Sequence, residues 1–363
     1  MNKDNFFMQR ALRLAKKGMG TTSPNPMVGC VLVKNGEIVG EGFHKKAGEA
    51  HAEIIALELA GERAKGAEIY LTLETCSHYG KTPPCVKAII KAGVKRAVIA
   101  MQDPNPLVAG QGIKKLKKAG LDVTVGVMGE EAKKVNEVFI KYITTKRPFV
   151  IGKIAQSLDG KIALSTGESK WITSEPARVK VHELRNYCDA VMVGIGTVLA
   201  DDPLLTCRLP GKRINLTRII VDSTAKIPLD ARILGCSEGK VIIATTNIAD
   251  KIKINTLKTK GFDVIETDAK DRKVDLVQLF GILGNMEITS VLVEGGSRLL
   301  TSLIKESLID KLIIFLAPIF LGKSGLSSIG DLFINELKKA PRFRFQSIEQ
   351  VGNDLMLEAY FMD

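Results

Sequence analysis

The chain has 363 residues, of which 45% are hydrophobic and 25% are charged. At roughly 150 residues per domain this length predicts two domains, and the balanced composition excludes a disordered, collagenous or low-complexity protein. The longest apolar run, residues 312–321, contains Pro318 and covers half of the ~20 residues that a membrane span needs. Charges within the N-terminal segment are unlike a signal peptide. We therefore expect a cytoplasmic protein without a membrane partner.

The net charge of +12 is concentrated in the first part of the chain. Residues 1–146 contain 23 Lys+Arg and 14 Asp+Glu, whereas residues 147–363 contain 29 and 26. Such a surplus suits a nucleic acid or a phosphorylated small molecule as partner. It is also what a lysine-rich solvated surface produces, and this is the interpretation that we prefer for most of the lysines.

Helix-like and strand-like segments alternate through residues 1–146, which predicts an α/β layered sheet. Apolar spacing predicts helices over residues 6–18, 51–65, 85–92, 113–119 and 130–142. Short apolar runs predict strands over residues 28–33, 38–42, 69–73, 97–101 and 123–127. The Asn35-Gly36 turn joins the first two of these strands as a hairpin.

A break at residues 144–148 ends the last of these helices and precedes a new strand over residues 149–155. We place the domain boundary here, between residues 146 and 147. The alternation then restarts, with strands predicted over residues 190–194, 218–222, 241–245, 264–267, 291–294 and 311–316. The pattern predicts an α/β protein of two domains.

A candidate metal site lies in the first part of the chain. His51-Ala52-Glu53 opens a predicted helix, and Cys76 and Cys85 follow a predicted strand. A catalytic zinc ion needs three protein ligands and one open position for water, and one imidazole with two thiolates supplies them. Cys85 begins a helix, where the dipole favours a thiolate. Glu53 can lie beside the metal without binding it and carry a proton from water to a leaving amine.

Two structural alternatives exist for this site. The four residues could be ordinary surface and core residues, or the metal could be structural, with His78 as a fourth ligand. Six cysteines in a cytosolic chain favour metal binding or free thiols over disulfides. We prefer the catalytic interpretation because the general base is present together with three ligands.

Two glycine clusters occur in the second part of the chain. The Gly194-Ile195-Gly196 segment does not fit a Rossmann fingerprint, because Leu199 occupies the third glycine position and no acidic residue follows at the right distance. The segment from Glu294 to Ser297 contains two glycines between a predicted strand and a predicted helix over residues 298–305. Its amides could hold a phosphate, or the glycines could form only a tight corner.

The pattern H-x-E followed by P-C-x-x-C is typical of zinc-dependent nucleobase deaminases. Here eight residues separate the cysteines, which is the insertion found in the pyrimidine deaminases of riboflavin biosynthesis, and Ser23-Pro24-Asn25-Pro26-Met27-Val28-Gly29-Cys30-Val31 resembles their entry segment. Residues 153–160, 169–173, 182–185 and 196–203 resemble the reductase domain of the same pathway. Over essentially its whole length the chain resembles the bifunctional riboflavin-pathway deaminase/reductase family.

This resemblance implies a cytidine-deaminase-like α/β/α domain over residues 1–146 and a dihydrofolate-reductase-like α/β domain over residues 147–363. It implies zinc-dependent hydrolytic deamination of 2,5-diamino-6-(5-phosphoribosylamino)pyrimidin-4-one, followed by NADPH-dependent reduction of the ribosyl to a ribityl chain. One Zn²⁺ per chain would be held by His51, Cys76 and Cys85, with Glu53 as the catalytic residue.

The resemblance also implies ligand contacts. In the first domain the substrate would contact Asn25, His44 and Lys81, although His44 could equally be a loop residue. NADPH would contact Ala155, Trp171, Thr197, Asp201, Ser223, Gly296, Ser297, Arg298, Leu299, Leu300, Thr301 and Ser302. The substrate of the second domain would contact Lys153, Ser169, Arg185, Leu205, Arg208 and Glu294. Trp171 could instead be a core residue and each arginine an ion-pair partner, and both Lys153 and Asp201 are candidates for the proton donor.

Two other functions remain as alternatives. A nucleic-acid-editing deaminase with an appended nucleotide-binding domain would use the basic first part to grip a backbone, and its binding would weaken steeply with salt. A ligand sensor that kept the fold without the chemistry would release no ammonia. We expect a phosphorylated pyrimidine as the small-molecule partner, no nucleic acid, and a homo-oligomer.

Overall fold

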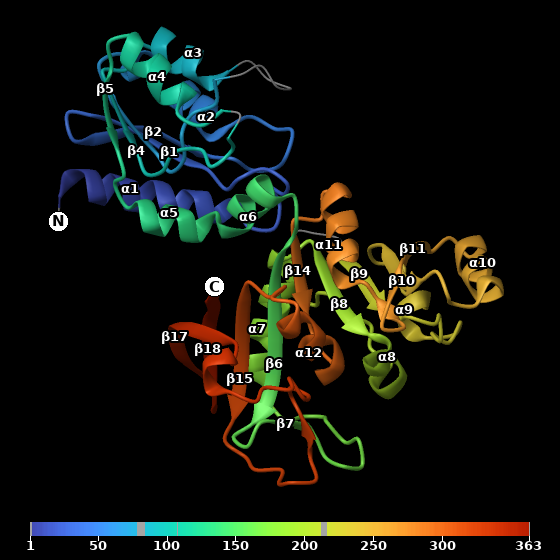
Figure 1. Ribbon diagram of the computed structural model, residues 1–363. Helices are drawn as coiled ribbons and strands as arrows, with labels where there is room; N and C mark the ends of the chain where they lie inside the picture. Colours follow the sequence, from blue (N-terminus) through green and yellow to red (C-terminus); the bar gives the residue numbers. More distant parts are fainter. Residues whose placement is uncertain (1, 78–83, 107, 212–215, 363) are drawn as a thin grey trace. The chain divides into compact units, whose positions relative to one another are not determined.

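The computed structural model in Figure 1 describes residues 2–77, 84–106, 108–211 and 216–362. Its chain divides into two compact units, Met1–Lys146 and Arg147–Asp363. The longest helices of the described segments have 13 residues, well short of the ~20 that a bilayer requires. None of the helices in these segments is therefore able to cross a membrane.

The first unit is built on a five-stranded sheet with the order β2-β1-β3-β4-β5. The strands are β1 (Gly29–Lys34), β2 (Glu37–Phe43), β3 (Glu68–Leu71), β4 (Arg96–Ile99) and β5 (Asp122–Val125). Strand β1 pairs antiparallel with β2 and β3, whereas β3, β4 and β5 are parallel. The predicted hairpin and the predicted α/β alternation are both confirmed.

Helices cover both faces of this sheet (Figure 1). They are α1 (Lys3–Ala15), η1 (Lys16–Gly18), α2 (Ala52–Ala60), η2 (Gly61–Ala64), α3 (Cys85–Lys91), α4 (Gln111–Lys118), α5 (Gly129–Val135) and α6 (Glu137–Thr145). Alternate strand residues such as Cys30 and Leu32 share a buried core with α2, α3 and α4, as the two-residue period of a strand requires.

Helix α2 lies directly against strand β2, and two glycines make this possible. A Cβ atom on Gly40 would lie 2.2 Å from the carbonyl oxygen of Ala56, and one on Gly42 would lie 2.6 Å from that of Ala52. A side chain at either position would therefore push the helix away from the sheet. The contact at Gly42 fixes the place where α2 begins.

The helix predicted over residues 130–142 is wrong as a single element, because α5 ends and α6 begins at Asn136. The buried Asn136 side chain accepts a hydrogen bond from the amide of Met27 (2.8 Å) and donates one to its carbonyl (3.0 Å). The backbone of Asn136 departs from helical geometry here, with φ −108° and ψ 20°, and its side chain fixes the junction of the two helices to the segment before β1.

The second unit contains a nine-stranded sheet with the order β11-β10-β9-β8-β14-β6-β15-β18-β17. In chain order its strands are β6 (Phe149–Ser157), β8 (Ala190–Gly194), β9 (Thr217–Val221), β10 (Val241–Thr246), β11 (Asp263–Thr267), β14 (Ser290–Val293), β15 (Lys311–Ala317), β17 (Arg342–Val351) and β18 (Asp354–Met362). The strands from β11 to β15 in this order are parallel, and β18 and β17 are antiparallel.

The remaining elements of this unit connect and cover the sheet (Figure 1). The helices are α7 (Glu175–Tyr187), α8 (Ile195–Asp201), α9 (Arg232–Gly235), α10 (Lys251–Thr259), α11 (Leu276–Asn285), α12 (Ser297–Lys305) and η3 (Leu337–Lys339). Two short ribbons pair β7 (Lys161–Ala163) with β16 (Leu326–Ser327) and β12 (Ala269–Lys270) with β13 (Lys273–Val274). The carboxyl ends of parallel strands are where α/β proteins bind ligands, and the residues after β8 and β14 lie there.

Candidate active sites in the two units

The structure brings His51, Cys76 and Cys85 together in the first unit. His51 caps the N-terminus of α2, Cys76 follows β3, and Cys85 is the first residue of α3. Nδ1 of His51 lies 3.6 Å from Sγ of Cys76 and 3.3 Å from Sγ of Cys85. All three ligand atoms lie within 4.8 Å of one another. Three segments separated in the sequence therefore point their donor atoms at one place.

These distances fit a tetrahedral zinc site. Bond lengths of about 2.3 Å for sulfur and about 2.1 Å for nitrogen, at tetrahedral angles, put the donor atoms about 3.6 Å apart. Hydrogen bonds from the Cys85 thiol and from His51 lower the pKa of Cys76 well below its usual range, which favours the thiolate form that binds a metal. The donor set and its spacing thus match what Zn²⁺ requires, with room for a fourth ligand.

Glu53 lies in the first turn of α2, two residues after His51, and is 3% exposed. Thr75 holds its carboxylate by donating a hydrogen bond of 2.8 Å to Oε1. Burial raises the pKa of Glu53, and the charge of Cys76 raises it further. A raised pKa makes this carboxylate a better proton acceptor than a solvent-exposed glutamate. Its position agrees with a proton-transfer role beside the metal.

Asn25 and His44 lie side by side next to this cluster. The Asn25 amide nitrogen is 3.2 Å from Nε2 of His44, whose Nδ1 is 3.2 Å from the carbonyl oxygen of Ala50. Burial lowers the pKa of His44, so the neutral ring donates from Nδ1 and accepts from Asn25 at Nε2. The His44 ring packs edge-on against His51 at 5.4 Å. His44 is therefore buried in the site and is not a solvent-exposed loop residue.

Lys81, the third residue expected to contact the substrate of this unit, lies outside the described residues, as does His78. The structure adds Glu74 and Thr75 to the site, which our sequence prediction missed. They are the two residues before Cys76 in the sequence. Glu74 follows the apolar run of β3, and a carboxylate in such an apolar context is a signal that could have identified it.

In the second unit Arg185 and Glu294 form a buried bidentate ion pair. Nη2 of Arg185 donates to Oε2 of Glu294 at 2.9 Å, and its Nε donates to Oε1. Nη1 donates to the carbonyl oxygen of Thr206 at 2.8 Å. Burial raises the pKa of Glu294, but Arg185, with smaller contributions from Lys153 and His182, lowers it below its usual value, which favours the ionised carboxylate. Burial also lowers the pKa of Lys153, which interacts with the charges of both partners.

Leu205 and Arg208 lie in the segment that follows α8. Leu205 is buried, whereas the Arg208 side chain is exposed. The amide of Arg208 donates to Nδ1 of His182 on α7 at 3.3 Å, and the Cys207 thiol donates to the carbonyl oxygen of His182. His182, whose pKa burial lowers to about 4, thus fixes the backbone on which Arg208 is carried. No residue pattern pointed to this role.

The corner between β14 and α12 lies against α8. The amide of Gly296 donates to Oγ1 of Thr197 at 3.0 Å, and a Cβ on Gly296 would lie 3.2 Å from that oxygen. The Gly296 amide is thus bonded to Thr197, and a side chain on Gly296 would crowd the Thr197 hydroxyl at the N-terminus of α12, the end of a helix that attracts anions. The side chains of Leu299, Leu300 and Thr301 on α12 are buried within the unit.

The remaining residues expected to contact ligands are distributed around the same sheet. Trp171 is 66% exposed and is not a core residue, and the Arg178 guanidinium lies 4.5 Å from its ring centroid. The Ser169 hydroxyl lies 3.4 Å from Oδ1 of Asp201. Ser223 follows β9, and its hydroxyl accepts from the amide of Val274 at 3.2 Å. Ala155 lies within β6, and Ser297, Arg298 and Ser302 lie on α12.

Comparison with known proteins agrees with this arrangement. Residues 1–101 match the cytidine and deoxycytidylate deaminase zinc-binding region, and residues 148–357 match the RibD C-terminal domain. The riboflavin biosynthesis protein RibD of Aquifex aeolicus is 47% identical, with 98% of this chain and 97% of that protein covered. RibD of Escherichia coli K12 is 44% identical, with 98% of each covered.

Solved structures of such proteins are also similar over the whole chain. RibD of Acinetobacter baumannii (form 1) superposes with a TM-score of 0.89 at 40% identity, and 99% of both chains is covered. A diaminohydroxyphosphoribosylaminopyrimidine deaminase/5-amino-6-(5-phosphoribosylamino)uracil reductase of Thermotoga maritima has a TM-score of 0.87 at 39% identity, again covering 99% of both. The expected deaminase-like and reductase folds are confirmed. The chain therefore belongs to the RibD family of riboflavin biosynthesis proteins, in which a deaminase zinc-binding region precedes a RibD C-terminal reductase domain.

Proposed function

We propose that the first unit, residues 1–146, removes the 2-amino group of 2,5-diamino-6-(5-phosphoribosylamino)pyrimidin-4-one as ammonia. The convergence of His51, Cys76 and Cys85 in front of the buried Glu53 is the observation that supports this function most strongly. When bound by these three residues, Zn²⁺ lowers the pKa of a water molecule so that it becomes a nucleophile at neutral pH.

Glu53 would move the proton in this reaction. It accepts a proton from the attacking water and delivers it to the departing amine, so the same carboxyl serves first as base and then as acid. The Thr75 hydroxyl keeps one carboxylate oxygen in a fixed orientation. Asn25 and His44, which are hydrogen-bonded to each other beside the cluster, would bind the pyrimidine, together with Lys81.

The second unit, residues 147–363, would then reduce the ribosyl group to a ribityl chain. NADPH, when bound, supplies the hydride for C1′ of the opened sugar. The corner formed by Gly296, Thr197 and the first turn of α12 supports a pyrophosphate position. Other cofactor contacts would come from Ala155, Trp171, Asp201, Ser223, Ser297, Arg298, Leu299, Leu300, Thr301 and Ser302.

The sugar phosphate would lie among Lys153, Ser169, Leu205, Arg208 and the Arg185–Glu294 pair. Nε and Nη2 of Arg185 already donate to Glu294. The exposed guanidinium of Arg208 is therefore the better partner for the phosphate. The proton that accompanies the hydride would come from Lys153 or Asp201. Burial lowers the pKa of Lys153, which favours release of a proton from this amine.

The proposed partner is thus a phosphorylated small molecule and not a nucleic acid. Relatives that match almost the whole chain carry names from riboflavin biosynthesis, which favours this substrate over an editing function. We also propose a cytoplasmic homo-oligomer. Exposed Phe345 and Ile348 on the edge strand β17 support self-association, and sedimentation velocity of the full chain would test it.

Incubation of the full chain with the diaminopyrimidinone ribosylamine phosphate tests both activities at once. Ammonia release reports the first unit, and the loss of NADPH absorbance reports the second. We expect ammonia without NADPH present, and NADPH oxidation only after deamination. Absence of ammonia release from the zinc-loaded protein would contradict the proposed first step.

A further inference from the structure

The proposed zinc ligand Cys76 lies in a short segment, residues 74–77. Helix α4 and the loop before it contact this segment at Glu74, Thr75 and Ser77. The described residues 102–106 and 108–110 belong to this loop, which lies between β4 and α4. Neither α4 nor the loop contributes a metal ligand to the cluster found among the described residues. Their contacts with the Cys76 segment therefore have no role in the chemistry assigned so far.

The first contact is made by the buried carboxylate of Glu74. Oε2 accepts hydrogen bonds from the amides of Asp103 (3.1 Å) and Gly110 (2.9 Å), and Oε1 accepts one from Ile113 (3.1 Å). Gly110 is the N-cap of α4, and Ile113 lies in its first turn. Glu74 thus satisfies helix-terminal amides that have no intrahelical partner, and its negative charge lies at the favourable end of the helix dipole.

The second contact is a close backbone approach at Gly112. A Cβ atom at this position would lie 2.3 Å from the carbonyl oxygen of Thr75 and 3.2 Å from Oε1 of Glu74. The helix therefore rests directly on the residue whose hydroxyl holds Glu53. Any displacement of this carbonyl would move both Thr75 and the adjacent Cys76.

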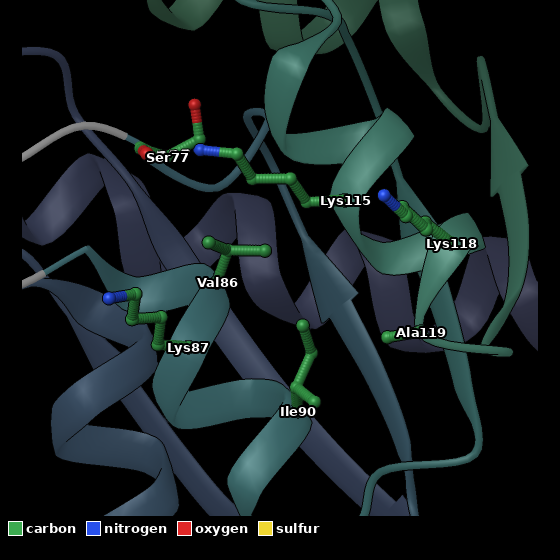
Figure 2. Close-up of a pocket in the computed structure, with 7 residues that line it drawn as sticks. All are labelled: Ser77, Val86, Lys87, Ile90, Lys115, Lys118 and Ala119. Atoms are coloured by element: carbon green, nitrogen blue, oxygen red, sulfur yellow. Dashed lines mark hydrogen bonds between the residues drawn. The ribbon is translucent and has the colours of Figure 1, made fainter.

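The third contact is made by Lys115, as Figure 2 shows. Its ammonium group donates a hydrogen bond of 2.7 Å to the carbonyl oxygen of Ser77. The lysine reaches this oxygen along a groove between α3 and α4 whose lining includes Val86, Ile90 and Lys118. Ser77 directly follows Cys76, so the metal ligand is held from α4 on both sides.

We infer that α4 is a clamp for the zinc-ligand segment, and that Glu74 and Lys115 are positioning residues for deamination. Neither side chain touches the metal-binding atoms; each acts by fixing the backbone that carries Cys76 and Thr75. The inference rests on the proposed zinc-dependent function of this unit. Groups that hold a metal ligand in place set how long the metal stays bound and how well the site is organised.

The test uses the zinc-loaded full chain with Lys115→Ala and Gly112→Ala as the principal variants. We expect each to release zinc to a chromophoric chelator about 10-fold faster than the wild type, with the deaminase kcat lower by a similar factor. The same variants loaded with Co²⁺ should show a shifted visible spectrum, because thiolate geometry sets those bands. In Glu74→Gln a side-chain NH2 group, which is only a donor, replaces one of the two oxygens that accept from three backbone N–H groups. This variant should therefore have the largest effect.

Three controls accompany these variants. Lys118→Ala changes a lysine that lines the same groove, and Gly281→Ala adds a Cβ to another helical glycine, where no atom lies within 4 Å. Both should release zinc at the wild-type rate. Lys115→Arg keeps a donor and should restore most of the retention. Reduction of the deaminated substrate by the same samples should stay unchanged, because that reaction belongs to the second unit. A wild-type circular dichroism spectrum of each variant shows that the first unit, which carries the substitutions, is folded.

The outcomes separate the clamp from the function on which it depends. If the wild type holds zinc and deaminates, but Lys115→Ala and Gly112→Ala have wild-type release rates and cobalt spectra, the clamp is wrong and the proposed function stands. If the wild type holds no zinc at His51, Cys76 and Cys85, the proposed function fails and the clamp fails with it. Loss of folding in Glu74→Gln leaves the other two variants to decide.

Discussion

Removal of Glu294 should destabilise the second unit more than removal of its partner Arg185. The two side chains are only 6% and 11% exposed, and breaking a buried ion pair costs about 3–5 kcal/mol because one charge stays behind without a partner. In Glu294→Ala the remaining charge is Arg185, and the neighbouring Lys153 repels it. In Arg185→Ala the remaining carboxylate still has Lys153 nearby, so the loss should lie at the lower end of the range.

Differential scanning calorimetry of the full chain would measure this difference. For a unit of this size about 1 kcal/mol corresponds to about 2–4 °C, so the transition of the second unit should fall by about 6–20 °C. The double variant, which leaves no unpaired partner, should be less destabilised than the sum of the single variants. If both single variants lost the same stability, Lys153 would not compensate the remaining Glu294 charge as argued. If each lost less than about 1 kcal/mol, the ion pair would not behave as a buried one.

The same pair predicts a dependence of stability on pH. Because Arg185 holds the pKa of Glu294 below its usual value, the folded state favours the ionised carboxyl. The stabilisation is therefore fully present above the unfolded pKa of about 4.3 and is lost as the pH falls through the lower folded value. Acid titration of the wild type and of Glu294→Ala should converge at low pH, and curves that remain parallel would contradict this.

Three further predictions concern bound groups. A His51→Ala chain should lose its zinc, as measured by elemental analysis, and zinc retained at one per chain would overturn the ligand assignment. Gly296→Val should weaken NADPH binding in a fluorescence titration, since the added side chain would crowd the Thr197 hydroxyl; unchanged affinity would leave the corner a structural turn. Trp171 is the sole tryptophan of the chain, so its emission reports its own site. Arg178→Ala should change that emission and its quenching by NADPH, and unaltered spectra would exclude a role for the stacked guanidinium.

Much of the metal site was predictable because its residues have distinctive chemistry and lie within 35 positions of one another, from His51 to Cys85. A buried Glu beside such a cluster follows from the same pattern. The partners of Glu74 and His182 were not predictable, since each side chain binds backbone amides of another segment of the chain. A carboxylate after an apolar strand marks Glu74 as unusual, but the residue types do not say which amides it binds.

Elements of the fold that depend on local sequence were likewise predicted better than those that depend on distant contacts. Buried parallel strands such as β10 and β14 are continuous apolar runs and were predicted within one or two residues. Strands β17 and β18 were missed, although Arg and Phe alternate at the start of β17, which is the pattern of a half-buried antiparallel strand. The strands that were predicted are all short apolar runs. The helix break at Asn136 was missed as well; its side chain bonds to Met27, 109 residues earlier, a contact that no local pattern records.

The central claim is that one chain contains two independent catalytic sites, and a Glu53→Gln variant tests it most directly. The change removes the proton carrier but none of the three zinc ligands, so zinc content should be unchanged while ammonia release falls by about 10²–10⁴-fold. Given the already deaminated aminouracil ribosylamine phosphate, the same variant should oxidise NADPH at the wild-type rate. Loss of both activities in a folded, zinc-loaded Glu53→Gln protein would contradict the claim and require a single shared site.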